Sequence, residues 1–300
     1  PLESLQGNNI ESLQEPYLQM IFSGNPEGTS KLDKEVAAAY LRLWGQKDSL
    51  NYKLFTDEGI KEQQMPGYHT LPYGATAIHR RNNWAAIIKG YSKYVWSSEI
   101  YSASNRYGRY PANGTVELLN AEGEQGSGIV QEGWDWNRYP SATIVYLPLE
   151  ELETEKSLLM FLSVESFAGA TQLGDNGVFG MVLNDSKGLN ADGLVSDRSI
   201  SFPEKLKAKK SVFSFGNKLI CIGTNISSVD QDHPVQTNIF QTALKNPEMP
   251  MYMDGQGLVK GLPFSSETGN WIVDPYGNGY HVLSGNPIHA QRKEQHSYNN

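Results

Sequence analysis

The stretch from Pro72 to Pro140 holds the residue types best suited to chemistry in this 300-residue chain. Aromatic rings can cover the apolar faces of pyranose rings, and Asn and Arg can hydrogen-bond to hydroxyl groups. Arg can also hold a carboxylate or a sulfate through two parallel hydrogen bonds. These residue types interleave in five clusters, Pro72–Gly74, His79–Arg81, Trp96–Tyr101, Asn105–Tyr110 and Gly133–Arg138. The pattern suits a binding site for an acidic sugar.

The same pattern has a structural interpretation. Arg and Tyr that alternate along strands often form a solvated face with cross-strand pairs, and Trp is often a core residue. His79 stands beside two arginines and is better explained as structural than as catalytic. The residue types alone therefore leave both interpretations open.

The elements that would position these clusters change in character along the chain. Apolar residues recur at helical spacing over residues 8–24 and 31–45, and Ser30 is the expected N-cap of the second helix. After about residue 60, short runs rich in Val, Ile, Tyr and Trp alternate with turn residues, as in Trp84–Lys89 and Trp271–Val273. We therefore expect a mainly β (α+β) chain, with a large antiparallel β-sandwich that follows short helices.

Composition excludes several function classes. The net charge of −8 and the absence of a basic face argue against nucleic acid. No apolar run is long enough for a membrane-spanning helix. The single Cys221, in an apolar run, is interpreted as a small buried hydrophobe, and the lysines of residues 205–210 as protection on an edge strand. Phosphate-loop, zinc-protease and serine-hydrolase motifs are missing from the sequence.

Five segments in order give the chain a specific resemblance. They are IHRRNNW (78–84), VWSSEIY (95–101), NRYGRY (105–110), EGWDWNRYPSAT (132–143) and YGNGY (276–280). Together they resemble the central region of polysaccharide lyase family 8. The resemblance is strong over about residues 72–150 and thinner towards the end of the chain.

This resemblance implies a fold and two domains. Family members have an incomplete helical (α/α) toroid followed by large antiparallel sheets. Residues 1–58 would be the end of the toroid, and residues 59–300 would be the sandwich, truncated at its C-terminus.

The resemblance also implies a reaction, which is the β-elimination of a uronic acid-containing polysaccharide. Glu99 falls on the catalytic glutamate of the family, and its implied role is to orient a Tyr and an Arg from the helical domain. The structural alternative is a strand carboxylate paired with Arg106 or Arg109. Asn105, Arg106 and Arg109 are candidate substrate-binding residues, and Trp134, Asp135, Trp136 and Arg138 are candidate supporting residues. The family's catalytic His and Tyr, in a motif like H-E-G-N-Y-x-x-Y, do not occur in these residues.

Partners follow from the same resemblance. The implied substrate is chondroitin or dermatan sulfate, with hyaluronan as a further candidate, and the implied compartment is secreted or periplasmic in a bacterium. No metal-binding residues are predicted, and a requirement for a divalent cation (Ca or Mg) is left open. The chain alone is expected to be inactive because it lacks the base and the proton donor. A non-catalytic carbohydrate-binding β-sandwich is the main alternative function, and a purely structural sheet domain is the other.

Overall fold

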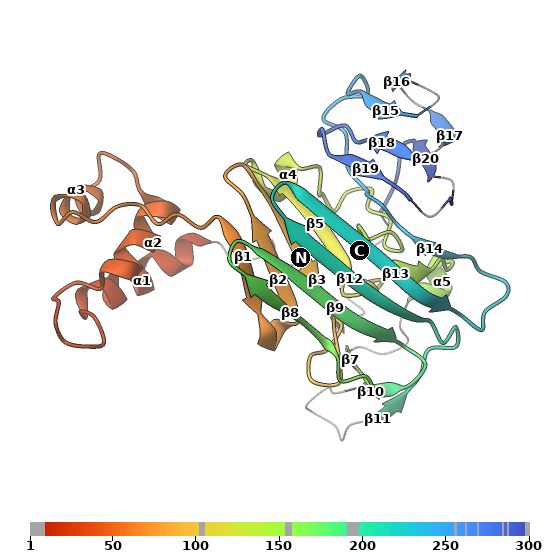
Figure 1. Ribbon diagram of the computed structural model, residues 1–300, viewed down its shortest axis with the longest axis horizontal. Helices are drawn as coiled ribbons and strands as arrows, with labels where there is room; N and C mark the ends of the chain where they lie inside the picture. The colour runs from red at the N-terminus through yellow and green to blue at the C-terminus, as the bar shows by residue number, and fades with distance from the viewer. Residues whose placement is uncertain are drawn as a thin grey trace. The chain divides into compact units, whose positions relative to one another are not determined.

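The computed structural model describes residues 10–101, 106–153, 158–190, 198–254, 257–261, 263–268, 270–283, 285–286 and 288–297. The chain separates into two compact units, the first ending at Pro66 and the second beginning at Gly67. The boundary predicted after residue 58 falls inside the first unit. The first unit is helical, and the second consists mainly of antiparallel sheets (Figure 1).

The helical unit contains a short 3-10 turn and three helices, namely η1 (Ile10–Leu13), α1 (Gln14–Phe22), α2 (Lys34–Trp44) and α3 (Leu50–Asp57). Helices α1 and α2 confirm the two helices that the periodicity of the sequence predicts, whereas α3 was not predicted. The N-cap of α2 is Asp33 and not Ser30, because the Asp33 carboxylate accepts hydrogen bonds from Glu35 N and Val36 N at 3.1 and 3.0 Å. Ile21, Ala37 and Phe55 form the fully buried centre of this unit.

The second unit begins with two four-stranded sheets. The first has the order β1-β2-β3-β5 and the second has the order β13-β12-β9-β8. Their strands are β1 (Gly67–Leu71), β2 (Thr76–Arg80), β3 (Trp84–Lys89), β5 (Thr115–Asn120), β8 (Ala168–Leu173), β9 (Asn176–Asn184), β12 (Lys207–Phe215) and β13 (Lys218–Ser227).

These two sheets pack face to face. A Cβ atom added to Gly177 would come within 2.2 Å of the Tyr68 ring, and one added to Gly90 would come within 2.7 Å of Phe179. Such close approach leaves no room for a side chain at either glycine. His79 is fully buried and lies 2.9 Å from Gly216 O, so it has a structural place between the sheets. The predicted antiparallel sandwich is confirmed.

Four further sheets complete the second unit, and every strand pairing among the described residues is antiparallel. Their orders are β11-β10-β7-β4, β14-β6, β16-β15-β18-β19 and β17-β20. The strands are β4 (Glu99–Tyr101), β6 (Thr143–Val145), β7 (Leu158–Ser163), β10 (Gly188–Asn190), β11 (Arg198–Ile200), β14 (Val235–Thr237), β15 (Met251–Met253), β16 (Gly257–Val259), β17 (Phe264–Thr268), β18 (Trp271–Val273), β19 (Gly279–His281) and β20 (Ile288–Arg292). The short helical turns of this unit are η2 (Pro72–Gly74), α4 (Gly123–Gly126) and α5 (Leu149–Leu152).

Two expectations for the second sheet were wrong. Cys221 is exposed although it pairs with the buried Val212, because β13 is an edge strand with no partner strand on its outer side among the described residues. The lysine run does not protect an edge, because β12 lies between β9 and β13. Alternation along β12 exposes Lys209 and buries Lys210, whose ammonium donates to the backbone oxygens of Asn113 and Ser141.

Candidate active site

Glu99 is the first residue of β4, a strand of three residues that pairs with β7. The next residue, Ile100, is 1% exposed and fixes the strand to the core. Because neighbouring side chains of a strand point to opposite faces, the burial of Ile100 turns Glu99 outward, and Glu99 is exposed. The sheet therefore holds the backbone of Glu99 and presents its carboxylate at the surface.

The loop before β4 is pinned along its length. Ser97 N donates to Phe161 O at 2.9 Å, and Lys93 N donates to Glu165 O at 2.7 Å. Tyr91, at the start of the loop, is buried against Phe161, with the ring centroids 5.8 Å apart. These contacts fix the path of the chain into Glu99.

Arg106 follows residues that lie outside the described part of the chain, among them Asn105. Its Nη1 lies 3.5 Å from Glu153 Oε1, and its side chain is 32% exposed. The guanidinium carbon also lies 5.1 Å from the centroid of the Tyr107 ring. Arg106 therefore reaches the surface, where it lies beside the carboxylate of Glu153.

Arg109 lies in a buried cluster of charges. Its Nη2 is 2.5 Å from Glu204 Oε2 and 3.6 Å from Asp185 Oδ2, and its guanidinium carbon lies 3.7 Å from the centroid of the Phe202 ring. The exposed fraction of its side chain is only 5%. The guanidinium of Arg109 is therefore not exposed for the predicted contact with substrate. Among the described residues, the carboxylates that contact its guanidinium are those of Glu204 and Asp185.

The carboxyl group of Asp185 in this cluster has a raised pKa. Burial raises the pKa of its carboxyl to about 7, and the nearby Glu204 acts in the same direction, whereas Arg109 opposes the shift. One arginine therefore faces two carboxylates, and the cluster would hold excess negative charge if both were ionised. Among the described residues, no hydrogen-bond donor contacts the buried Asp185 Oδ1, and the ionised form therefore lacks solvation there.

The predicted supporting residues build a rigid turn. Asp135 forms an ion pair with Arg138, whose guanidinium carbon lies 4.1 Å from the centroid of the Tyr146 ring. Gln241 accepts a hydrogen bond from Asp135 N at 2.7 Å and donates to Arg138 O at 3.0 Å. Two of the four candidate supporting residues, Asp135 and Arg138, therefore pair with each other.

Both tryptophans of this turn are core residues. Trp134 and Trp136 are each 3% exposed and pack edge-to-face with the ring of Tyr139. The Trp136 indole donates to Ser297 Oγ at 3.0 Å and so ties the turn to a segment 161 residues away in the sequence. The geometry gives both residues a bracing role, and neither presents a ring to solvent.

Sequence reasoning did not identify Glu204 and Asp185 as partners of Arg109. They lie 95 and 76 residues further along the chain, and no local spacing connects them with it. It also did not separate the exposed aromatic residues Tyr94 and Trp96 from the buried Trp134 and Trp136.

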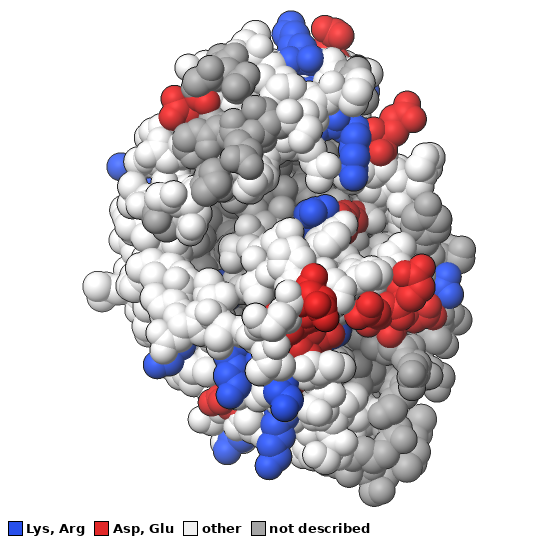
Figure 2. All heavy atoms as spheres, turned by 90° about the vertical axis from the view of Figure 1, so that its right-hand side faces the viewer, with Lys and Arg blue, Asp and Glu red and all other residues white. Residues whose placement is uncertain are grey.

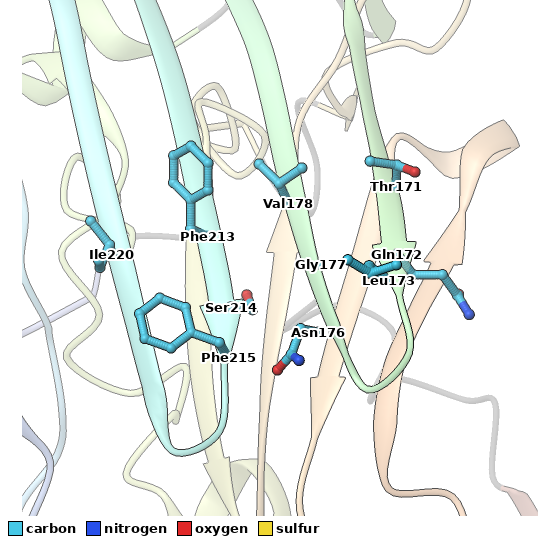
Figure 3. Close-up of a pocket in the computed structure, with 10 residues that line it drawn as sticks. All are labelled: Thr171, Gln172, Leu173, Asn176, Gly177, Val178, Phe213, Ser214, Phe215 and Ile220. Atoms are coloured by element: carbon cyan, nitrogen blue, oxygen red, sulfur yellow. The ribbon is translucent and has the colours of Figure 1, made fainter.

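Surface charge on the face drawn in Figure 2 is divided into separate groups. The two largest acidic groups lie just below the middle of the view, further acidic side chains lie near its upper edge, and basic side chains lie mostly below and above the two large groups. Within the described residues, no group of three or more His, Cys, Asp or Glu side chains could hold a metal ion. In the same part of the chain, no helix combines the length and apolarity needed to cross a membrane.

The family model for the super-sandwich domain of polysaccharide lyase family 8 matches residues 69–299. The chain therefore belongs to polysaccharide lyase family 8. Among curated proteins, it is 32% identical over 297 residues to a chondroitin sulfate ABC endolyase from Proteus vulgaris, and 33% identical over 299 residues to a chondroitin sulfate ABC exolyase from the same organism. These matches cover 97% and 94% of this chain. The chain spans 28% of the length of each of these relatives.

Solved structures share the fold at lower identity. A Paenibacillus xanthan lyase superposes with a TM-score of 0.64 at 17% identity, over 93% of this chain and 25% of that one. A Streptomyces coelicolor chondroitin AC lyase in complex with chondroitin sulphate gives a TM-score of 0.54 at 16% identity, over 93% of this chain and 33% of that one. At these identities the likeness extends to the fold alone.

Proposed function

We propose that this chain supplies the sheet side of a composite active site in a lyase that cleaves chondroitin or dermatan sulfate by β-elimination. The observation that carries the proposal is the family match over residues 69–299, within which Glu99 stands exposed at the start of β4. Two relatives at 32% and 33% identity are chondroitin sulfate ABC lyases, which supports a sulfated polysaccharide as the substrate.

The reaction sets the chemical demands on the site. A base takes the proton from C5 of the uronate, and the electron pair of that C–H bond forms the C4–C5 double bond. The C4–O bond breaks, and the departing oxygen takes up a proton, which leaves an unsaturated uronide. The uronate carboxylate must be neutralised for C5 to become acidic, and so the site needs both acid–base groups and charge stabilisation.

Glu99 is placed in a positioning role. Its exposed carboxylate can accept hydrogen bonds from a Tyr hydroxyl and an Arg guanidinium that a helical domain presents, because β4 and β7 hold its backbone. Arg106 is proposed to contact an acid group of the substrate at the surface. Arg109 is assigned a structural role, because Glu204 and Asp185 hold it inside the unit.

The test compares the 300-residue chain with the full-length protein. The unsaturated product absorbs ultraviolet light, so turnover of chondroitin sulfate is followed as a rise in absorbance. We expect turnover by the full-length protein and none by the chain alone, because the base and the proton donor are absent from its sequence.

Each alternative predicts a different result. Robust turnover by the chain alone would contradict the composite site. If the full-length protein bound glycans without producing the unsaturated uronide, the carbohydrate-binding module would be favoured in place of the lyase.

A further inference from the structure

Three residues of the loop before Glu99 stand out from their surroundings. Lys93 is exposed, Tyr94 is 71% exposed and Trp96 is 47% exposed, whereas the residues around them, Ser92 and Ser97, are buried. Large exposed aromatic side chains grouped on one short segment are unusual unless something binds there.

The backbone that carries them is fixed by the neighbouring sheet. Ser92 N donates to Val95 O at 2.9 Å, which closes the loop on itself, and Tyr94 N donates to Ser92 Oγ at 3.1 Å. Further hydrogen bonds tie Lys93 N to Glu165 O and Ser97 N to Phe161 O. A rigid backbone lowers the entropy cost of ordering the loop around a ligand. The exposed rings are thus presented by a preorganised loop.

The ammonium group of Lys93 is not neutralised by a carboxylate of the described residues. Its ammonium lies 4.8 Å from the centroid of the Tyr94 ring, and in the described part of the chain it has no ion-pair partner. Glu165, whose backbone oxygen accepts from Lys93 N, has a carboxylate that accepts a hydrogen bond from Asn184 Nδ2 at 2.7 Å. In a chain of net charge −8, this leaves a local cation available to an anionic ligand.

The position of the loop relates it to the proposed active site. Trp96 precedes Glu99 by three residues, so their Cα atoms are at most about 11 Å apart even if the chain is fully extended. A pyranose ring next to the one that meets Glu99 is therefore within reach of the indole. The Lys93 ammonium lies beside the Tyr94 ring, and the exposed Trp96 indole follows two residues later. These groups match the two features of a glycosaminoglycan unit, its apolar ring face and its carboxylate or sulfate.

We propose that Lys93, Tyr94 and Trp96 form a binding subsite for an anionic polysaccharide beside Glu99. Trp96 stacks on the face of a pyranose ring, Lys93 binds a sulfate or carboxylate of the same stretch of glycan, and Tyr94 holds the ammonium in place. This proposal rests on the proposed function for its substrate class, but it concerns binding and not the elimination step.

The test is calorimetric titration of the 300-residue chain with a chondroitin 4-sulfate hexasaccharide. We expect Trp96→Ala to weaken binding by about fivefold or more, which is the effect of truncating an anchoring aromatic residue. Trp96→Phe keeps a ring and should retain most of the affinity. The matched control is Trp271→Ala, because Trp271 has nearly the same exposed fraction, 48%, and lies in the sheet β16-β15-β18-β19.

The charge is tested in the same way. Lys93→Gln should weaken binding at low salt, and its difference from the wild type should shrink as added salt screens the charge. Lys260→Gln removes an exposed lysine elsewhere and should leave the affinity unchanged. Unaltered melting temperatures establish that the variants are folded.

Three results would overturn the subsite. The first is the absence of saturable binding by the wild-type chain, and the second is equal affinity for Trp96→Ala and the wild type. The third is protection of Trp96 from acrylamide quenching in the glycan-free full-length protein, because another part of the polypeptide would then cover it. None of these results depends on turnover. Failure of the subsite is therefore distinguishable from failure of the lyase assignment, which the absorbance assay measures.

Discussion

Replacing Arg109 with Met tests whether this residue holds the fold or contacts substrate. Arg109 is paired with Glu204 through two hydrogen bonds of 2.5 and 3.4 Å and with Asp185 at 3.6 Å, and the exposed fractions of the three side chains are only 5–6%. Methionine fills a similar volume but leaves the Glu204 carboxylate buried without its cation. Removing one partner of such a pair typically costs about 3–5 kcal/mol of unfolding free energy. We expect a loss in this range for Arg109→Met.

The measurement is urea denaturation at neutral pH, followed by circular dichroism with the slope of the transition checked for constancy. The double variant Arg109→Met/Glu204→Leu should recover much of the loss, because it removes the isolated charge together with its partner. A loss below about 1 kcal/mol, as expected of an exposed ion pair, would refute the structural role. So would a double variant whose loss equals the sum of the two single losses.

Two further predictions concern pH. The folded-state pKa of Asp185 is raised to about 7 from 3.8, so the folded state binds more protons than the unfolded state between these values. The contribution of Asp185 to stability is therefore complete below about pH 4 and is lost as the pH rises through 7. In this range the free energy of unfolding falls with a limiting slope of about 1.4 kcal/mol per pH unit. Asp185→Asn should flatten this decline. Burial lowers the pKa of Lys210 to about 7 from 10.5. Its contribution is complete above about pH 10.5 and is lost as the pH falls through 7, so Lys210→Met should flatten that part of the profile. Melting temperatures measured across pH 4–10 check both, and profiles parallel to the wild type would contradict them.

The sequence predicted the elements that depend on local pattern. Residues Trp84–Lys89 and Trp271–Val273 are strands with the expected bounds. A run of β-branched and aromatic residues bounded by turn residues favours a strand whatever its partner strand is. The place of a strand within its sheet is a different matter. The exposure of Cys221 and the burial of Lys210 follow from the order β13-β12-β9-β8, which pairs residues far apart in the chain and leaves no local signal.

The same distinction applies to the candidate site. Glu99 was found through the motif around it, and its exposure follows from the burial of Ile100 next to it. Arg109 was assigned to substrate by its proximity to Arg106 in the sequence, whereas the fold brings it to Glu204, 95 residues away. Local spacing therefore indicated the proposed site but could not show which of its charged residues form ion pairs inside the protein.

The role of Glu99 is tested most directly by the turnover of Glu99→Gln in the full-length protein. Gln preserves the size of the side chain but removes its charge, and a positioned acid–base group contributes about 10²–10⁴-fold to turnover. We predict a fall of at least about tenfold in kcat on chondroitin sulfate, since an orienting partner carries part of that factor. The melting temperature should change little because Glu99 is exposed.

The control for this measurement is Glu150→Gln. Glu150 is exposed in α5. The strand residue Glu117 is unsuitable as a control, because it is only 5% exposed and burial raises the pKa of its carboxyl to about 7. We predict a wild-type kcat for Glu150→Gln, in contrast to the loss in Glu99→Gln. An unchanged kcat in Glu99→Gln, or a loss that a lowered melting temperature explains, would contradict the sheet side of the active site as proposed.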